Sequence, residues 1–177
     1  MKPGEKGYTL LELLVSMTII VMVAGAASVA IFQILRNTQR NNDHLTVARQ
    51  VENAGYWISR DAQMTQGVTT TANLTLPDFL SLRWTEWDDD GDPIYHSANY
   101  TLESLTNGIG TLKRTYESSA GASEQTLIAQ YIYYDPADAG ATSNTSYQDP
   151  VLTVKLTAVF KQAMESREYQ ITRRPGL

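Results

Sequence analysis

One carboxylate lies inside a long apolar segment near the start of the chain. Glu12 is the only charged residue in the stretch 8–35. An ionisable group inside a membrane segment costs about 3 kcal/mol near the bilayer centre and less near an interface, so it usually has a paired function. The alternative is that Glu12 lies level with the lipid headgroups, because it is close to the start of the segment. The neighbouring residues decide between the two.

Few other side chains offer catalytic or metal-binding chemistry. The 177 residues include no cysteine and only two histidines, His44 and His96, which lie far apart. This composition excludes disulfides, thiolate catalysis, cysteine-based metal sites and a three-histidine zinc site. The formal net charge is −5, and the lack of a basic run argues against nucleic acid as a partner. We expect neither enzymatic activity nor a cofactor.

Asp88, Asp90 and Asp92 resemble the first ligands of a calcium loop. Read as an EF-hand from Asp88, the sixth position is Pro93 instead of glycine and the twelfth is Asn99 instead of glutamate, so that motif is excluded. Two interpretations remain. One is an acidic, solvated hairpin turn, which the Asp-Gly dipeptide favours, and the other is a looser calcium site made by the three carboxylates.

The apolar segment predicts a membrane helix. Residues 13–32 carry no charge, and at 1.5 Å per residue they span about 30 Å, the thickness of a hydrocarbon core. The segment is apolar on all sides, unlike a soluble amphipathic helix. A cleaved secretory signal is the alternative, with Ala24-Gly25-Ala26 as its cleavage site. The apolar run is longer than such a signal needs and continues past these residues.

Residues 37–66 continue a helical pattern. Apolar and small residues recur there at three- and four-residue spacing: Leu45, Ala48, Val51, Gly55, Ile58 and Ala62. No proline interrupts residues 8–66, and Gly67 is a plausible stop. We therefore expect one helix of about 55 residues.

After Gly67 the pattern changes to a period of two, with Leu80, Leu82 and Trp84 alternating with polar residues. We expect strands at 80–85, 94–102, 111–116, 125–134, 151–160 and 169–173, and a long surface loop at 135–150. Short strands joined by tight turns predict an antiparallel sheet. The fold class is therefore α+β, with one long helix followed by that sheet.

The residues around Glu12 read Lys6-Gly7-Tyr8-Thr9-Leu10-Leu11-Glu12-Leu13. They resemble the leader and methylation motif of type IV pilins and of type II secretion pseudopilins. That motif is a short basic leader ending in glycine, then a large apolar residue, Ser or Thr, two apolar residues and Glu, before a long apolar run. The resemblance covers about residues 1–35. It implies a pilin-like fold, in which the second half of the helix packs on the sheet.

The resemblance also implies a chemistry. A prepilin peptidase would cut between Gly7 and Tyr8 and methylate the new amine of Tyr8. This amine gives Glu12 a cation four residues away, about 6 Å along the helix axis. In the family, the counterpart of Glu12 is thought to neutralise the amine of a neighbouring subunit during filament assembly. The sequence leaves open whether the pair forms within one chain or between chains.

The expected organisation follows from these positions. It comprises a cleaved leader at 1–7, a transmembrane and filament-core helix at 8–35, its amphipathic continuation at 36–67 and an extracytoplasmic β-rich head at 68–177. The implied partners are prepilin peptidase, other pilin or pseudopilin subunits, a membrane assembly platform and, before assembly, the lipid bilayer. The implied location is the cytoplasmic membrane, with the head outside, and then a filament in the periplasm or at the cell surface.

Finer features look like those of minor subunits of the PilW and GspJ kind: Ser59-Arg60-Asp61, the hairpin rich in Trp and Asp, and Leu112-Lys113-Arg114. The alternative is a membrane-anchored or secreted extracytoplasmic binding protein or enzyme that uses a conventional signal. An enzyme would have to use Glu86 and the neighbouring aspartates, which lack an identifiable nucleophile or histidine partner. A binding surface would use the strand aromatics, which are more typical of a core: Trp84, Trp87, Tyr131, Tyr133 and Tyr134.

Overall fold

The computed structural model describes residues 9–172 and contains one α-helix, α1 (Leu10–Met64), within that range. Its 55 residues confirm the expected uninterrupted helix. The helix ends slightly earlier than expected, and Gly67 opens a short strand instead of marking the stop. The hydroxyl of Thr65 donates to the carbonyl oxygens of Gly67 (2.9 Å) and Arg83 (3.0 Å), so it attaches the helix end to the sheet.

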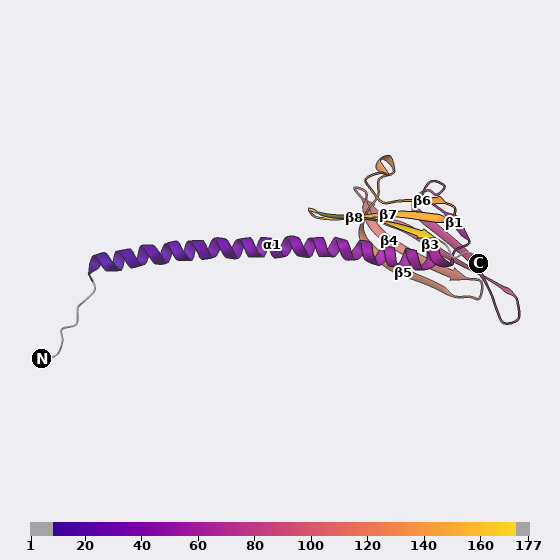
Figure 1. The fold of residues 1–177 in the computed structure, drawn as a ribbon, viewed down its shortest axis with the longest axis horizontal. Helices are drawn as coiled ribbons and strands as arrows, with labels where there is room; N and C mark the ends of the chain where they lie inside the picture. The colour runs from indigo at the N-terminus through magenta and orange to yellow at the C-terminus, as the bar shows by residue number, and fades with distance from the viewer. Residues whose placement is uncertain (1–8, 173–177) are drawn as a thin grey trace. The chain divides into compact units, whose positions relative to one another are not determined.

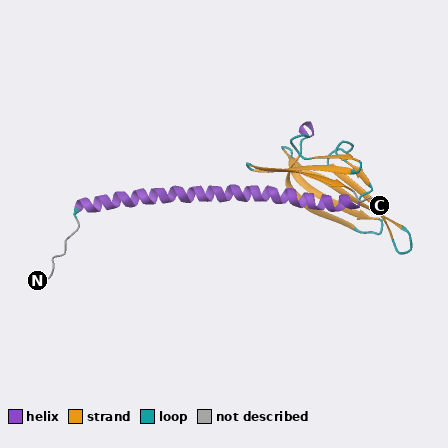
Figure 2. Ribbon diagram, viewed as in Figure 1, coloured by secondary structure: helices purple, strands orange, loops and turns teal. Residues whose placement is uncertain are grey.

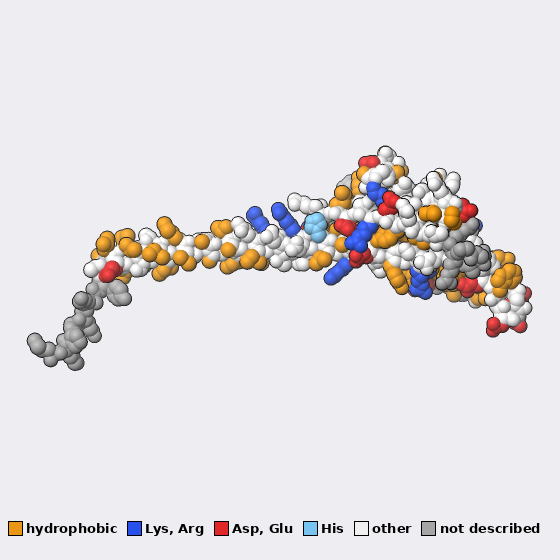
Figure 3. All heavy atoms as spheres, viewed as in Figure 1, with side chains coloured by type: hydrophobic (Ala, Val, Ile, Leu, Met, Phe, Trp, Pro, Cys, Tyr) orange, Lys and Arg blue, Asp and Glu red, His pale blue; other side chains and the backbone are white. Residues whose placement is uncertain are grey.

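The chain divides into two compact units, Met1–Asn42 and Asp43–Leu177. In the first unit, every described residue, from 9 to 42, is exposed. Figure 3 shows hydrophobic side chains along the visible face of this part of α1. Among the described residues, α1 is the one helix long and apolar enough to cross a membrane. An exposed apolar helix of this kind requires lipid or other protein around it.

The second unit contains the last part of α1 and an antiparallel sheet of eight strands (Figures 1 and 2). The strands are β1 (Gly67–Thr69), β2 (Asp78–Trp87), β3 (Pro93–Thr106), β4 (Ile109–Ser118), β5 (Ser123–Tyr133), β6 (Asn144–Gln148), β7 (Val151–Phe160) and β8 (Ala163–Thr172). Their order is β1-β2-β3-β4-β5-β7-β6, and β8 pairs with the other edge of β7. The predicted α+β class with an antiparallel sheet is confirmed.

The predicted surface loop at 135–150 is wrong in part, because it contains β6 and the short 3₁₀-helix η1 (Pro136–Asp138). Strands β5 and β6 lie along the same edge of β7, since β8 occupies the opposite edge throughout. Ser143 joins them: its N–H donates to the Tyr133 carbonyl (2.9 Å), and its hydroxyl accepts from the Thr157 N–H (2.9 Å). β5 and β6 therefore act as one strand along this edge of β7, and residues 134–142 form a loop that interrupts it. The sequence of β6 is polar, so it carries no alternating pattern to predict it.

The core lies between the last part of α1 and the sheet. The helix buries the predicted face at Val51, Gly55, Ile58 and Ala62, whereas Leu45 was wrongly included and is 52% exposed. A Cβ added at Gly55 would lie 2.2 Å from the ring of Tyr169, whose hydroxyl donates to the Val51 carbonyl. Gly55 therefore allows the helix and β8 to approach closely.

A buried ion pair also fastens α1 to the sheet. The Arg114 guanidinium donates two hydrogen bonds to Asp61, at 2.6 Å from Nε and 3.0 Å from Nη2. The Tyr100 hydroxyl donates to the same carboxylate at 2.6 Å. Burial, and then the charge of Asp61, raise the pKa of Tyr100. Arg114 also lies 5.1 Å from the ring centroid of Trp57. Both charges are therefore buried and satisfied by each other where α1 packs on β3 and β4.

Candidate processing and assembly site

Glu12 lies in the first turn of α1, where it forms a reciprocal pair with Thr9. The Glu12 carboxylate oxygen Oε2 accepts from the backbone N–H and from the hydroxyl of Thr9, both at 3.0 Å. The Glu12 N–H donates to the Thr9 hydroxyl at 3.3 Å. This geometry is a capping box, which satisfies N–H groups that a helix start otherwise leaves unpaired. Glu12 therefore stabilises the helix start within its own chain.

Within the described residues, the capping box uses one oxygen of the Glu12 carboxylate. Within residues 9–172, no hydrogen bond reaches the other oxygen of Glu12, Oε1. The sequence-predicted positions Gly7 and Tyr8 lie outside the described residues. A cut between them would leave the Thr9 nitrogen in a peptide bond, so the capping box would survive processing. Among the described residues, the arrangement holds a carboxylate at the helix start with one oxygen that accepts no hydrogen bond.

The hydroxyl groups of the apolar segment are satisfied by the helix itself. Ser16 donates to the Glu12 carbonyl (2.7 Å), Thr18 to Val15 (2.7 Å), and Ser28 to Ala24 (2.8 Å). In lipid, an unpaired hydroxyl would be costly, and bonds to the preceding turn avoid that cost. These residues are thus compatible with a hydrocarbon environment despite their polarity.

The acidic run forms the tight turn between β2 and β3. The Asp88 carboxylate accepts from the N–H groups of Asp90 (3.0 Å) and Asp92 (2.7 Å), and Gly91 has a positive φ of 84°. Among the described residues, no three His, Asp or Glu side chains are placed to hold a metal ion. One carboxylate oxygen of Asp88 therefore closes the turn by accepting these two hydrogen bonds.

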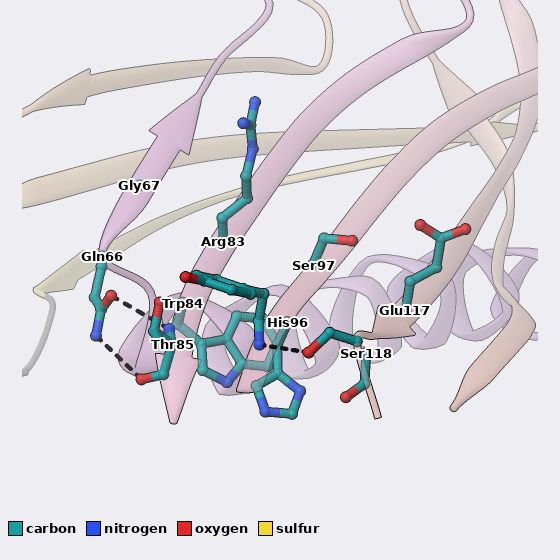
Figure 4. Close-up of a pocket in the computed structure, with 11 residues that line it drawn as sticks. Gln66, Gly67, Arg83, Trp84, Thr85, His96, Ser97, Glu117 and Ser118 are labelled. Carbon is teal, nitrogen blue, oxygen red and sulfur yellow. Dashed lines mark hydrogen bonds between the residues drawn. The ribbon is translucent and has the colours of Figure 1, made fainter. Parts of the chain in front are cut away.

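A hollow of about 620 Å³ lies on the sheet, and the residues drawn in Figure 4 line it with backbone or side-chain atoms. Arg83, Ser97 and Glu117 form one cross-strand row in it. Figure 4 shows the rings of Trp84 and His96 on the other side of these strands. His96 is stacked on Trp84 at 5.3 Å and bonds the Tyr116 hydroxyl through Nδ1 at 2.7 Å.

The aromatic residues considered for a binding surface therefore differ in position. Trp84 is 6% exposed and belongs to the core, while Trp87 is 70% exposed. The His96 Nε2 lies 3.4 Å from the Glu86 carboxylate but forms no hydrogen bond among the described residues, whereas Glu86 accepts from the Trp84 indole N–H at 3.2 Å. Tyr116 is thus the hydrogen-bond partner of the His96 imidazole, and Trp84 is that of Glu86.

Comparison with known families identifies the segment that contains the capping box. Residues 2–28 match the prokaryotic N-terminal methylation motif. The chain carries a prepilin methylation motif. No curated protein and no solved structure matches the chain. The motif match ends within α1 and therefore supports a pilin-like protein without distinguishing among its subgroups. The long helix that carries this motif and the antiparallel sheet on which it packs together form a pilin-like architecture.

Two functional contacts were not predicted from the sequence. The Thr9–Glu12 capping box had a visible signal, a threonine followed three residues later by glutamate before an apolar run. The Asp61–Arg114 pair had none, because the two residues lie 53 positions apart and either charge suits an exposed surface.

Proposed function

We propose that this chain is a structural subunit of a type IV pilus or type II secretion pseudopilus. The observation that carries the proposal is the methylation motif at residues 2–28, joined to a 55-residue helix whose first part is apolar and exposed. A membrane holds such a helix before assembly, and a bundle of similar helices replaces the lipid afterwards.

Processing begins at the leader. Prepilin peptidase cuts between Gly7 and Tyr8 and methylates the Tyr8 amine, which keeps its positive charge. The apolar helix stays on the mature chain, in contrast to a conventional secretory signal. The match of residues 2–28 to the methylation motif supports this step.

Assembly then uses Glu12. The Oε1 atom of its carboxylate accepts a hydrogen bond from the charged Tyr8 amine of a neighbouring subunit, while Oε2 keeps its bonds to Thr9. Two unpaired charges in an apolar filament core are costly, and the correct axial register pairs them. The charge pair therefore selects the register in which subunits add.

The subunit is a minor one of the PilW and GspJ kind. The chain lacks the cysteines that close a loop in many major pilins, and its Trp- and Asp-rich hairpin is the β2–β3 turn. The head faces outside the cytoplasm, and the helix crosses the cytoplasmic membrane until it enters a filament. Its partners are the peptidase, the assembly platform and other pilin subunits.

Recovery with sheared filaments tests the proposal. In a host that makes the filament, the tagged chain is expected in the sheared filament fraction, and deletion of residues 2–7 should prevent its arrival there. A chain found as a soluble exported protein, with the same recovery in a strain that lacks prepilin peptidase, would favour the conventional-signal alternative.

A further inference from the structure

The part of α1 that follows the apolar segment carries cations and amides but no carboxylate. Residues 36–42 comprise two arginines, four amide residues and one threonine, and all of them are exposed. Between Glu12 and Asp43 the chain has no acidic residue, although its formal net charge is −5. In Figure 3, blue Lys and Arg side chains follow the orange apolar ones along α1. This segment is therefore a local basic region in an acidic protein.

The two arginines of this segment lie on one face of the helix. Arg36 and Arg40 are four residues apart, which places their side chains one above the other. Among residues 9–172, neither forms an ion pair or lies over an aromatic ring. The next carboxylate in the chain, Asp43, pairs with Lys161 at 2.8 Å. Both guanidinium groups can therefore bind an anion from outside the chain.

The position of this pair along α1 matches the edge of a bilayer. Residues 13–35 carry no charge and extend about 35 Å, which crosses a hydrocarbon core of about 30 Å with a modest tilt. Residues 36–42 add about 10 Å, and the headgroup region on one side of a bilayer is about 5–8 Å thick. Arg36 and Arg40 therefore reach the headgroups at the end of the span nearer to Asp43.

The anions at that level of a membrane are lipid phosphates. The planar guanidinium group of arginine matches the oxygens of a phosphate and can donate two parallel hydrogen bonds to them. The amide side chains of Asn37 and Asn41 add uncharged donors beside the arginines. No carboxylate in residues 13–42 repels the phosphate. The charge and the donor chemistry of the segment thus fit a phospholipid headgroup.

We propose that Arg36 and Arg40 together bind the phosphate of a phospholipid headgroup at the end of the membrane span nearer to Asp43. The inference rests on the proposed function, because it requires α1 to cross a bilayer before assembly. It goes further by naming the two residues that hold the lipid and the headgroup chemistry that they recognise. Two guanidinium groups one turn apart hold one headgroup, so the loss of both should remove the preference for phosphate.

Native mass spectrometry of the full-length protein in detergent tests the binding. The probes are dioleoylphosphatidylglycerol and dioleoylglycerol, which share both acyl chains and differ in the headgroup that carries the phosphate. We expect the protein to retain the phospholipid about tenfold more than dioleoylglycerol. Arg36→Gln/Arg40→Gln should abolish this preference. Glutamine has nearly the helix propensity of arginine, so α1 should persist.

Arg49→Gln/Arg83→Gln is the matched control. It removes the same charge from two exposed arginines that lie outside residues 36–42 and form no ion pair among the described residues. This variant should retain the phospholipid as the wild type does. Equal losses in the two double variants, or equal retention of the two lipids by the wild type, would overturn the inference.

Carbonate extraction of the host membranes tests the membrane crossing separately. Wild type and both double variants should stay in the membrane pellet, because residues 13–35 are unchanged. A chain that resists carbonate but shows no preference for the phospholipid would overturn this inference and leave the proposed function standing. A wild-type chain that carbonate releases would overturn both.

Discussion

The carboxylate of Glu12 has two tasks in this account, and they require different properties of the side chain. Capping of α1 needs an oxygen that accepts hydrogen bonds from Thr9, whereas pairing with the Tyr8 amine of a neighbour needs a negative charge. Glutamine keeps the oxygen and loses the charge. Substitutions at this position can therefore separate the two tasks.

Glu12→Gln and Glu12→Ala form the matched pair. Both variants should still be cleaved after Gly7, and both should be strongly depleted from sheared filaments because both lack the charge. Only the alanine variant also loses the two hydrogen bonds that the Glu12 carboxylate accepts from Thr9, while the backbone N–H of residue 12 can still donate to the Thr9 hydroxyl. Quantitative immunoblots of the cell and filament fractions measure this. Wild-type assembly by Glu12→Gln would show that capping is the function of Glu12.

The buried pair of Asp61 and Arg114 should make a measurable contribution to the free energy of unfolding. Asp61→Asn leaves the Arg114 charge buried without its partner, so it should lower the free energy of unfolding by about 3–5 kcal/mol. Glu52→Gln is the control, because Glu52 pairs with Arg167 at the surface and its loss should cost less than about 1 kcal/mol. Denaturant unfolding of the full chain in detergent compares them. Equal, small losses would contradict a structural role for the buried pair.

Ionisation of Tyr100 should make the stability of the folded protein depend on pH. Its pKa is raised in the folded protein by burial and then by Asp61, so the folded state keeps the phenol proton to higher pH than the unfolded state. The stability from this group is complete below the unfolded pKa of about 10 and is lost as the pH rises above it. Tyr100→Phe should flatten the fall in stability at alkaline pH. An unchanged slope in pH-dependent melts would count against this cause.

At the scale of elements, the two helix glycines Gly25 and Gly55 occupy opposite environments. A Cβ at Gly25 meets nothing within 4 Å, whereas a Cβ at Gly55 overlaps the ring of Tyr169. Gly55→Ala should therefore destabilise the second unit by about 1–3 kcal/mol, and Gly25→Ala should leave its melting temperature unchanged. Thermal melts of both variants provide the comparison. A defect of Gly25→Ala confined to filament assembly would locate contacts with neighbouring subunits.

The turn between β2 and β3 gives a second prediction at this scale. Asp88 uses one carboxylate oxygen to bond the N–H groups of Asp90 and Asp92. We expect the same melting temperature with calcium and with a chelator, since the turn is closed by these bonds. A rise of several degrees in calcium would instead support the calcium site that the three aspartates suggested.

The elements that the sequence predicted well are those with a regular pattern. The absence of proline and the spacing of Val51, Gly55 and Ile58 predicted a long helix with one buried face. Alternation at Leu80, Leu82 and Trp84 predicted β2. β6 lacked such a pattern because its residues are polar, although it pairs with β7, the next strand in the chain. The loop before it depends on Ser143, and a single serine gives no sequence signal for that contact.

For the whole molecule, charged residues are rare in the apolar stretch 8–35 and common after it, and this difference separates the first compact unit from the second. The first unit exposes an apolar helix, and the second has its own core and buried ion pair. The methylation motif lies entirely in the first unit, so the site that suggests the function is separate from the head that would determine its neighbours. Variants of the head should therefore change partner choice without preventing removal of the leader.

The mass of the mature protein tests the central claim most directly. Mass spectrometry of the chain extracted from membranes of a host with prepilin peptidase should show residues 8–177 with one added methyl group on Tyr8. The same host without the peptidase should yield the intact leader. A mature chain that begins near Ala27, or an intact and unmethylated leader in the presence of the peptidase, would contradict the account.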